Sequence, residues 1–127
     1  MPPTNRPRSS LIRGDIVLAH FPFTDLSETK LRPAVILWAS ATQTDFLIAF
    51  ISSQNVADIS DNEVALLSSH AEFALTGLRV PSKIRTERLV TLSRSLITRR
   101  LGKLGPALIS ELDSALIATL GLRHFSP

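Results

Sequence analysis

The stretch AVILWASATQTDFLIAFI, residues 34–51, decides the fold of this 127-residue chain. Its two apolar runs, Ala34 to Trp38 and Phe46 to Ile51, are rich in Val, Ile, Leu and aromatic residues, and a polar stretch separates them. This pattern predicts a β-hairpin. Because nearly every position of both runs is apolar, we expect burial on both faces, as in a small closed or partly closed sheet. Trp38 and Phe50 are expected in its core.

The segments on either side of the hairpin extend the sheet. Further strands are predicted at Ile16 to Ala19, Glu63 to Leu67, Leu78 to Ile84 and Arg88 to Leu92. The polar segment Thr24 to Arg32 would join the first strand to the hairpin as a loop. Pro81 interrupts the later strands, and Ser69 to Leu75 fits a helical turn that stops at Gly77.

A helix is predicted near the C-terminus. Pro106 suits a first helical turn, and Gly121 ends the periodic pattern. Between them the apolar residues recur at helical spacing, at Leu108, Leu112, Ala115, Leu116 and Leu120. This stripe is expected to pack on the sheet or on a second subunit. The fold class is therefore mainly β (α+β), with a C-terminal α-helix and short helical insertions.

Composition favours one folded domain. The apolar fraction of 44% argues against disorder, and we expect a domain over residues 13–122 between two tails, 1–12 and 123–127. The absence of cysteine excludes disulfides and thiolate metal sites. No stretch approaches the ~18 apolar residues of a membrane span. We expect a cytoplasmic protein with no membrane partner.

Basic residues gather in one part of the chain. Residues 79–103 hold eight Lys and Arg residues against one carboxylate, Glu87, a local net charge of +7 within a chain whose net charge is +3. Lys and Arg gain affinity for nucleic acid by displacing condensed counterions, so this segment is a candidate phosphate-binding surface. A solvated basic face is the alternative.

The inventory of reactive residues points to phosphodiester chemistry. His20, His70 and His124 lack the spacing of metal ligands, so we expect no metal. No nucleophile elbow and no glycine-rich phosphate loop is present, so no nucleotide cofactor is expected. The planar fork of arginine matches phosphate oxygens, and its permanent charge suits it to stabilise negative charge and not to accept a proton.

The motifs resemble those of a known family. The runs Arg13-Gly-Asp-Ile-Val-Leu, Phe21-Pro-Phe-Thr-Asp and Leu31-Arg-Pro-Ala-Val-Ile-Leu resemble the N-terminal signature of MazF/PemK-type toxins of bacterial toxin–antitoxin pairs. Ile51-Ser-Ser-Gln and Ser82-Lys-Ile-Arg-Thr are similar to later motifs, so the resemblance covers about residues 13–122. It implies a small SH3-like barrel with appended helices, a homodimer and a cognate antitoxin. It also implies metal-independent cleavage of single-stranded RNA through the RNA's own 2′-hydroxyl.

The resemblance also implies roles for single residues. Arg32 would be the main catalytic residue at the scissile phosphate, and Ser52, where the family commonly has Thr, would hold a phosphate oxygen. Glu28 matches a loop carboxylate proposed as the base. RNA contacts would come from Lys30, Ser53, Lys83 and Arg85.

Several alternatives remain open from sequence. Arg32 could form a structural ion pair with Asp15 or Asp25, and Ser52 could only satisfy backbone groups at a strand end. The same fold also serves non-enzymatic toxins that trap DNA gyrase by protein contact, and a nucleic-acid-binding regulator could use the basic segment alone. Fold alone does not separate these functions.

Overall fold

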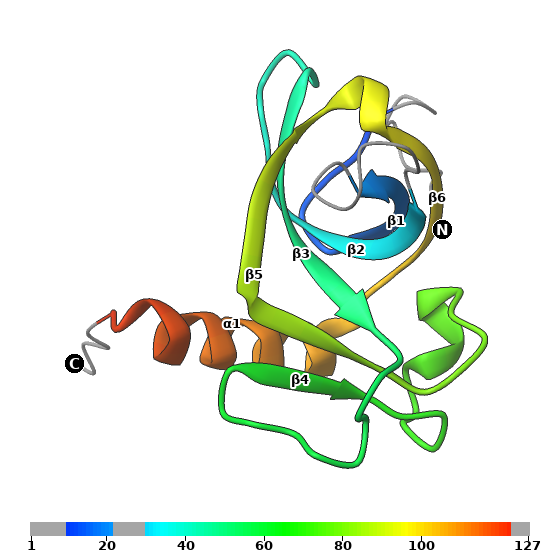
Figure 1. The fold of residues 1–127 in the computed structure, drawn as a ribbon, viewed down its shortest axis with the longest axis vertical. Helices are drawn as coiled ribbons and strands as arrows, with labels where there is room; N and C mark the ends of the chain where they lie inside the picture. Colours follow the sequence, from blue (N-terminus) through cyan, green and yellow to red (C-terminus); the bar gives the residue numbers. More distant parts are fainter. Residues whose placement is uncertain (1–9, 22–29, 123–127) are drawn as a thin grey trace.

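The computed structural model describes residues 10–21 and 30–122. Its six strands are β1 Asp15–Phe21, β2 Lys30–Ala39, β3 Asp45–Ser52, β4 Glu63–Leu66, β5 Ser82–Ser93 and β6 Ile97–Lys103. Two 3₁₀ turns, η1 Phe73–Thr76 and η2 Arg94–Leu96, interrupt them, and helix α1 Pro106–Leu120 follows (Figure 1). The predicted mainly β fold with a C-terminal helix is confirmed. None of the described helices is long and apolar enough to cross a membrane.

The strands form one antiparallel sheet in the order β4-β5-β3-β2-β1-β6. Figure 1 shows the sheet curling, so that β1 and β2 lie within the curve bounded by β5 and β6. Register shifts mark bulges in β2 and β5, which increase bending and twist. In the described part of the chain β4 and β6, the two end strands, do not pair with each other. The expected barrel is therefore strongly curved but open.

The sheet buries both of its faces, as the apolar runs predicted. Along β2, Ala34 and Ile36 enter one core cluster inside the curl, whereas Val35 and Leu37 enter a second cluster on the opposite face. Helix α1 covers the second face with its buried residues Leu108, Leu112 and Ala115. Each β2 residue in this run thus contributes to one of two cores, which explains the absence of an apolar–polar alternation.

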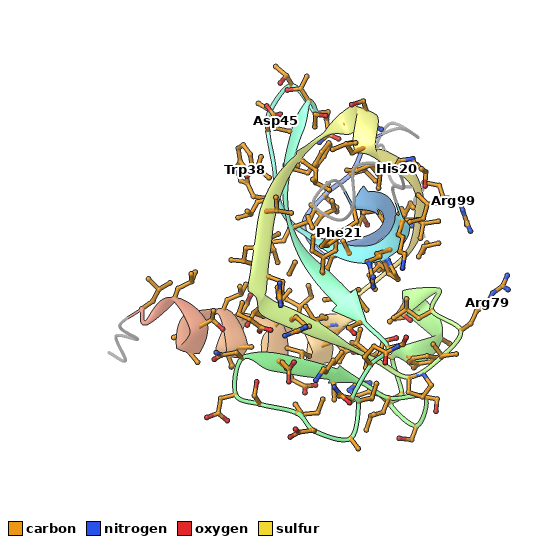
Figure 2. All side chains as sticks on the ribbon, viewed as in Figure 1. His20, Phe21, Trp38, Asp45, Arg79 and Arg99 are labelled. Atoms are coloured by element: carbon orange, nitrogen blue, oxygen red, sulfur yellow. The ribbon has the colours of Figure 1, made fainter. Side chains whose placement is uncertain are left out.

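The two aromatic residues predicted in the core have different environments. Phe50 is 7% exposed and lies in the core, as predicted. Trp38 is 52% exposed and lies on the outer side of the sheet (Figure 2), so its prediction is wrong. The reason is a bulge between Ile36 and Trp38. The extra residue, Leu37, is buried in the core, and the Trp38 side chain lies outside the core.

The later strands also differ from their predictions. One continuous strand, β5, replaces the predicted pair of strands, and Pro81 immediately precedes it instead of breaking it. Strand β6 was not predicted, because its basic residues obscure the pattern of a strand. Its exposed Arg99 and Arg100 follow from its position at the sheet edge, where charged side chains are common.

Two glycines allow η1 to pack directly on β6. A Cβ atom on Gly77 would collide with the carbonyl oxygen of Leu101, and one on Gly102 would collide with the carbonyl oxygen of Leu75. Gly77 also has φ +73°, a left-handed conformation that favours glycine. The helical turn predicted over Ser69 to Leu75 is present in shorter form, as η1 Phe73–Thr76, and it ends at Gly77 as predicted.

Helix α1 begins at Pro106 and ends before Gly121, as predicted. Glu72, from the segment before η1, caps its N-terminus. The backbone N–H groups of Ala107 and Leu108 donate to the Glu72 carboxylate at 3.0 and 2.9 Å. These two hydrogen bonds lower the pKa of Glu72 below its usual 4.5. The ionised carboxylate also interacts favourably with the positive end of the helix.

We expect Glu72→Gln to destabilise the protein at neutral pH and to have less effect in acid. A lowered pKa contributes stability above the unfolded value of 4.5, and this contribution is lost as the pH falls through the folded value. Urea unfolding of both proteins between pH 3 and pH 7 measures it. Equal stability at pH 7, or a gap that widens in acid, would contradict the capping role.

Candidate active site

The sheet register brings Arg32 and Ser52 together. Ala34 on β2 lies opposite Phe50 on β3. This pair is the last of the β2–β3 ladder, and Arg32 and Ser52, each two residues beyond it, line the same two hollows. Both residues are half-buried, close to the ends of their strands. The pair implied by the family resemblance is therefore a pair of neighbours in space.

The Arg32 guanidinium is supported by aromatic rings. Its Cζ lies 5.5 Å from the centroid of the Phe21 ring, a cation–π distance, and Phe21 in turn packs on Phe50 with ring centroids 4.3 Å apart. Arg32 Nε is buried and has no hydrogen-bond partner among the described residues. An unpartnered buried donor is costly unless a ligand satisfies it.

Asp15 and Asp25 were the two possible ion-pair partners of Arg32, and the structure describes only Asp15. The Asp15 carboxylate contacts Arg100 Nε at 3.0 Å and accepts a hydrogen bond from the Ile12 N–H, so it serves another arginine. Asp25 lies outside the described residues. A structural ion pair between Asp15 and Arg32 is therefore not formed.

The Ser52 hydroxyl oxygen accepts a hydrogen bond from the backbone, and its own proton remains available for donation. The Gln54 backbone N–H donates to Ser52 Oγ at 3.0 Å. A hydroxyl that accepts a hydrogen bond can still donate its own proton. Ser52 thus satisfies a backbone group at a strand end, which was the alternative to a role at phosphate. Its hydroxyl can also donate to a phosphate oxygen.

Arg32, Ile51 and Ser52 lie between two hollows and line both of them. The larger hollow, about 470 Å³, is also lined by Leu18, Leu31, Ser53, Gln54, Arg79 and Arg99. The smaller one, about 240 Å³, is also lined by Phe21, Phe50, Arg85 and Arg88. Figure 2 shows Arg79 and Arg99 extending on the same side of the molecule. The Arg32–Ser52 pair therefore stands between two basic surfaces.

Some basic residues of segment 79–103 line the two hollows, and others bind other parts of the protein. Arg79, Arg85, Arg88 and Arg99 line the two hollows. Elsewhere, Arg100 pairs with Asp15. Arg94 donates to Gln43 at 3.2 Å and stacks over the Phe46 ring. A uniform solvated face does not describe this arrangement.

The other sequence-predicted residues are distributed around this centre. Ser53 lines the larger hollow, and Arg85 lines the smaller one while its Nε donates to Glu87 at 2.8 Å. Lys30 is exposed at the first position of β2. Glu28 lies outside the described residues. The described residues contain no cluster of three or more His, Asp or Glu that could hold a metal ion.

Lys83 is placed differently from the prediction. It is 6% exposed, and its Nζ lies 3.1 Å from Asn55 O, 3.0 Å from Asp58 O and 2.9 Å from Glu63 Oε2. These contacts use all three donors of the ammonium group. The geometry argues against a contact between Lys83 and RNA, and we do not include this residue in the RNA-binding surface.

Glu63 balances the buried charge of Lys83. Burial raises the pKa of its carboxyl. Hydrogen bonds from the Ser60 N–H and the Lys83 ammonium together lower the pKa by more than burial raises it, so the net pKa lies below 4.5. Its side chain is 7% exposed. Glu63 thus supplies a carboxylate against the buried Lys83 ammonium group.

One protein-family model matches most of the chain. A family model described as "PemK-like, MazF-like toxin of type II toxin-antitoxin system" matches residues 12–120. The chain belongs to this family. Comparison of this toxin with curated proteins gives no match.

Solved structures share the fold of the toxin. An endoribonuclease in complex with its cognate antitoxin, from a mycobacterial species, is 19% identical, with TM-score 0.69 over 91% of this chain and 99% of its own. Mycobacterium tuberculosis toxin MazF-mt6 is 21% identical, with TM-score 0.68 over 87% and 99%. A MazE-MazF structure from Deinococcus radiodurans is 20% identical, with TM-score 0.67 over 89% and 98%. At these identities the likeness shows the fold.

Sequence reasoning did not assign four residues that line the hollows, namely Gln54, Arg79, Arg88 and Arg99. The clustering of charge in the basic segment was a signal for the three arginines. The charge pattern did not show which of these arginines lie near Arg32, because that depends on the course of β6 and on the packing of η1 against it. Gln54 could have been found from its position directly after the Ile51-Ser-Ser motif.

We expect Glu63→Ala to destabilise the protein by about 3 kcal/mol, because it leaves the Lys83 charge buried without its partner. The matched control is Glu87→Ala, whose carboxylate is 32% exposed and pairs with Arg85 at the surface. That change should cost less than about 1 kcal/mol. Urea unfolding measures both. Equal costs would contradict the distinction between the two ion pairs.

Proposed function

We propose that this protein is the toxin endoribonuclease of a type II toxin–antitoxin system and that it cleaves single-stranded RNA without a metal ion. The observation that carries the proposal is the meeting of Arg32 and Ser52 between two basic hollows. Membership of the MazF-like family supports it, as do fold neighbours that are named endoribonucleases.

The proposed reaction uses the nucleophile of the substrate. The RNA 2′-oxygen attacks the adjacent phosphorus, the bond to the 5′-oxygen breaks, and a 2′,3′-cyclic phosphate and a protonated 5′-oxygen result. The Arg32 fork stabilises the added negative charge on the phosphate oxygens, and the Ser52 hydroxyl donates to one of them. DNA is not cleaved because it lacks the 2′-oxygen.

A separate group must take the 2′ proton. Arginine stays protonated at neutral pH and is a poor base, so Arg32 is suited to stabilise negative charge on the phosphate and on the leaving 5′-oxygen, which takes up a proton from water. We assign the base to Glu28 on the strength of the family resemblance. In the sequence Glu28 stands two residues before Lys30, the first residue of the strand that carries Arg32.

The flanking nucleotides are proposed to occupy the two hollows. A strand crossing Arg32 and Ser52 would meet Arg79 and Arg99 on one side and Arg85 and Arg88 on the other. Lysine and arginine contacts to phosphate supply affinity that does not depend on sequence. Ser53 and Lys30 are proposed as further RNA contacts.

The proposal includes protein partners and a compartment. One fold neighbour was solved with its cognate antitoxin and another as MazE-MazF, and we propose a cognate antitoxin and a homodimer for this toxin. We propose that the toxin acts in the cytoplasm, where messenger RNA is available.

The test is cleavage of a single-stranded RNA in EDTA by the parent and by Arg32→Ala. We expect Arg32→Ala to lower kcat/KM by about 100- to 1,000-fold, because it removes a charge that stabilises the transition state. Product ends should be 2′,3′-cyclic phosphates. A substrate with one 2′-deoxynucleotide at the cleavage position should resist the parent enzyme.

The control is Arg13→Ala, which removes a half-exposed arginine that pairs with Asp113 on α1, outside both hollows. It should cleave like the parent. Intact RNA at high enzyme concentration would refute the endoribonuclease proposal and favour a toxin that acts by protein contact. Equal cleavage by the parent and Arg32→Ala would refute the role of Arg32.

A further inference from the structure

We propose that Lys83 is a positioning residue that holds the Ser52 hydroxyl in place through the turn of residues 55–58. The inference rests on the proposed function, because it gives Ser52 a task at the substrate phosphate. Lys83 itself does not touch the substrate. It acts through the backbone of the segment that follows β3.

Lys83 fixes both ends of this segment. In the β3–β5 pairing its main chain lies opposite Ser52, the last residue of β3. Its side chain reaches past Ser52 and binds the carbonyl oxygens of Asn55 and Asp58 at 3.1 and 3.0 Å. One residue thus sets the position of the strand end and of the turn beyond it.

The turn has few other internal contacts. The Asp58 N–H donates to Asn55 O at 3.1 Å. Asn55 has φ +51°, a left-handed conformation that L-residues rarely adopt, although asparagine tolerates it better than most. The charge-assisted hydrogen bonds from Lys83 to two carbonyls offset this strain. Without the ammonium group the turn is expected to relax.

The turn is joined directly to the Ser52 hydroxyl. Gln54, the residue before Asn55, donates its N–H to Ser52 Oγ at 3.0 Å. A shift of the turn would move this donor and with it the preferred direction of the hydroxyl proton. The connection therefore runs from Lys83 through Asn55 and Gln54 to Ser52.

Glu63 holds the ammonium in this position. Its Oε2 lies 2.9 Å from Lys83 Nζ, and both side chains are more than nine-tenths buried. Its Oε1 accepts the Ser60 N–H at 3.0 Å, which ties down the other end of the loop before β4. The residues of the turn are exposed except for the half-buried Val56, and the buried charge pair beneath them ties the turn to the folded core.

The first experiment compares the parent with Lys83→Met, which keeps an unbranched side chain and removes the charge. We expect kcat on single-stranded RNA to fall about 10- to 100-fold with KM within about twofold, because a misplaced group costs most in the transition state. Hydrogen exchange at the amides of residues 53–58 should be faster. Arg13→Met, which removes a half-exposed arginine outside both hollows, is the matched control and should change none of these.

The second experiment separates positioning from stability. Lys83→Met combined with Glu63→Leu removes both buried charges, an exchange for apolar side chains that often restores stability. We expect Tm to recover while kcat stays low and the 53–58 amides stay exposed to exchange. Recovery of kcat together with Tm would overturn the proposal, and so would an unchanged kcat in folded Lys83→Met.

The two proposals fail in distinguishable ways. If the parent does not cleave RNA, the proposed function fails, whereas hydrogen exchange still reports whether Lys83 orders residues 53–58. If the parent cleaves RNA and exchange of these amides is unchanged in Lys83→Met, the positioning role fails and the endoribonuclease proposal stands.

Discussion

The constraint on which the structure depends is that one small sheet buries both of its faces. Alternate residues of β2 and β3 enter two different cores, one inside the curl and one beneath α1. The strands can become polar only where both cores end, and Arg32 and Ser52 stand at those ends. The apolar packing of the sheet therefore determines where phosphate chemistry is possible, and the aromatic residues Phe21 and Phe50 form the border between core and site.

Charged groups secure the segments that the apolar cores do not reach. Glu72 joins the loop before η1 to the start of α1, Asp15 holds Arg100 of the edge strand β6, and Glu63 holds Lys83 beneath the turn after β3. Each carboxylate connects two elements distant in sequence. Arg79, Arg88 and Arg99 line the hollows together with Arg85, which pairs with Glu87, and these arginines give the hollows their positive charge.

Local patterns were sufficient to predict the hairpin, the C-terminal helix from Pro106 and the turn ending at Gly77. Arg32 and Ser52 as a pair came from the family resemblance, and the register of β2 and β3 makes them neighbours. The exposure of Trp38, the strand β6 and the burial of Lys83 were not predictable, because each depends on a tertiary feature. These features are a bulge, an edge position and a carboxylate from a different strand, none of which leaves a periodic signal.

The central claim is that Arg32 and Ser52 act as a unit on one phosphate. A double-mutant cycle tests it most directly, with kcat/KM on single-stranded RNA measured for the parent, Arg32→Ala, Ser52→Ala and the double variant. Groups that stabilise the same transition state are not additive. The account predicts that the double variant loses clearly less than the product of the two single losses. A loss equal to that product would show that the two residues act independently and would contradict the account.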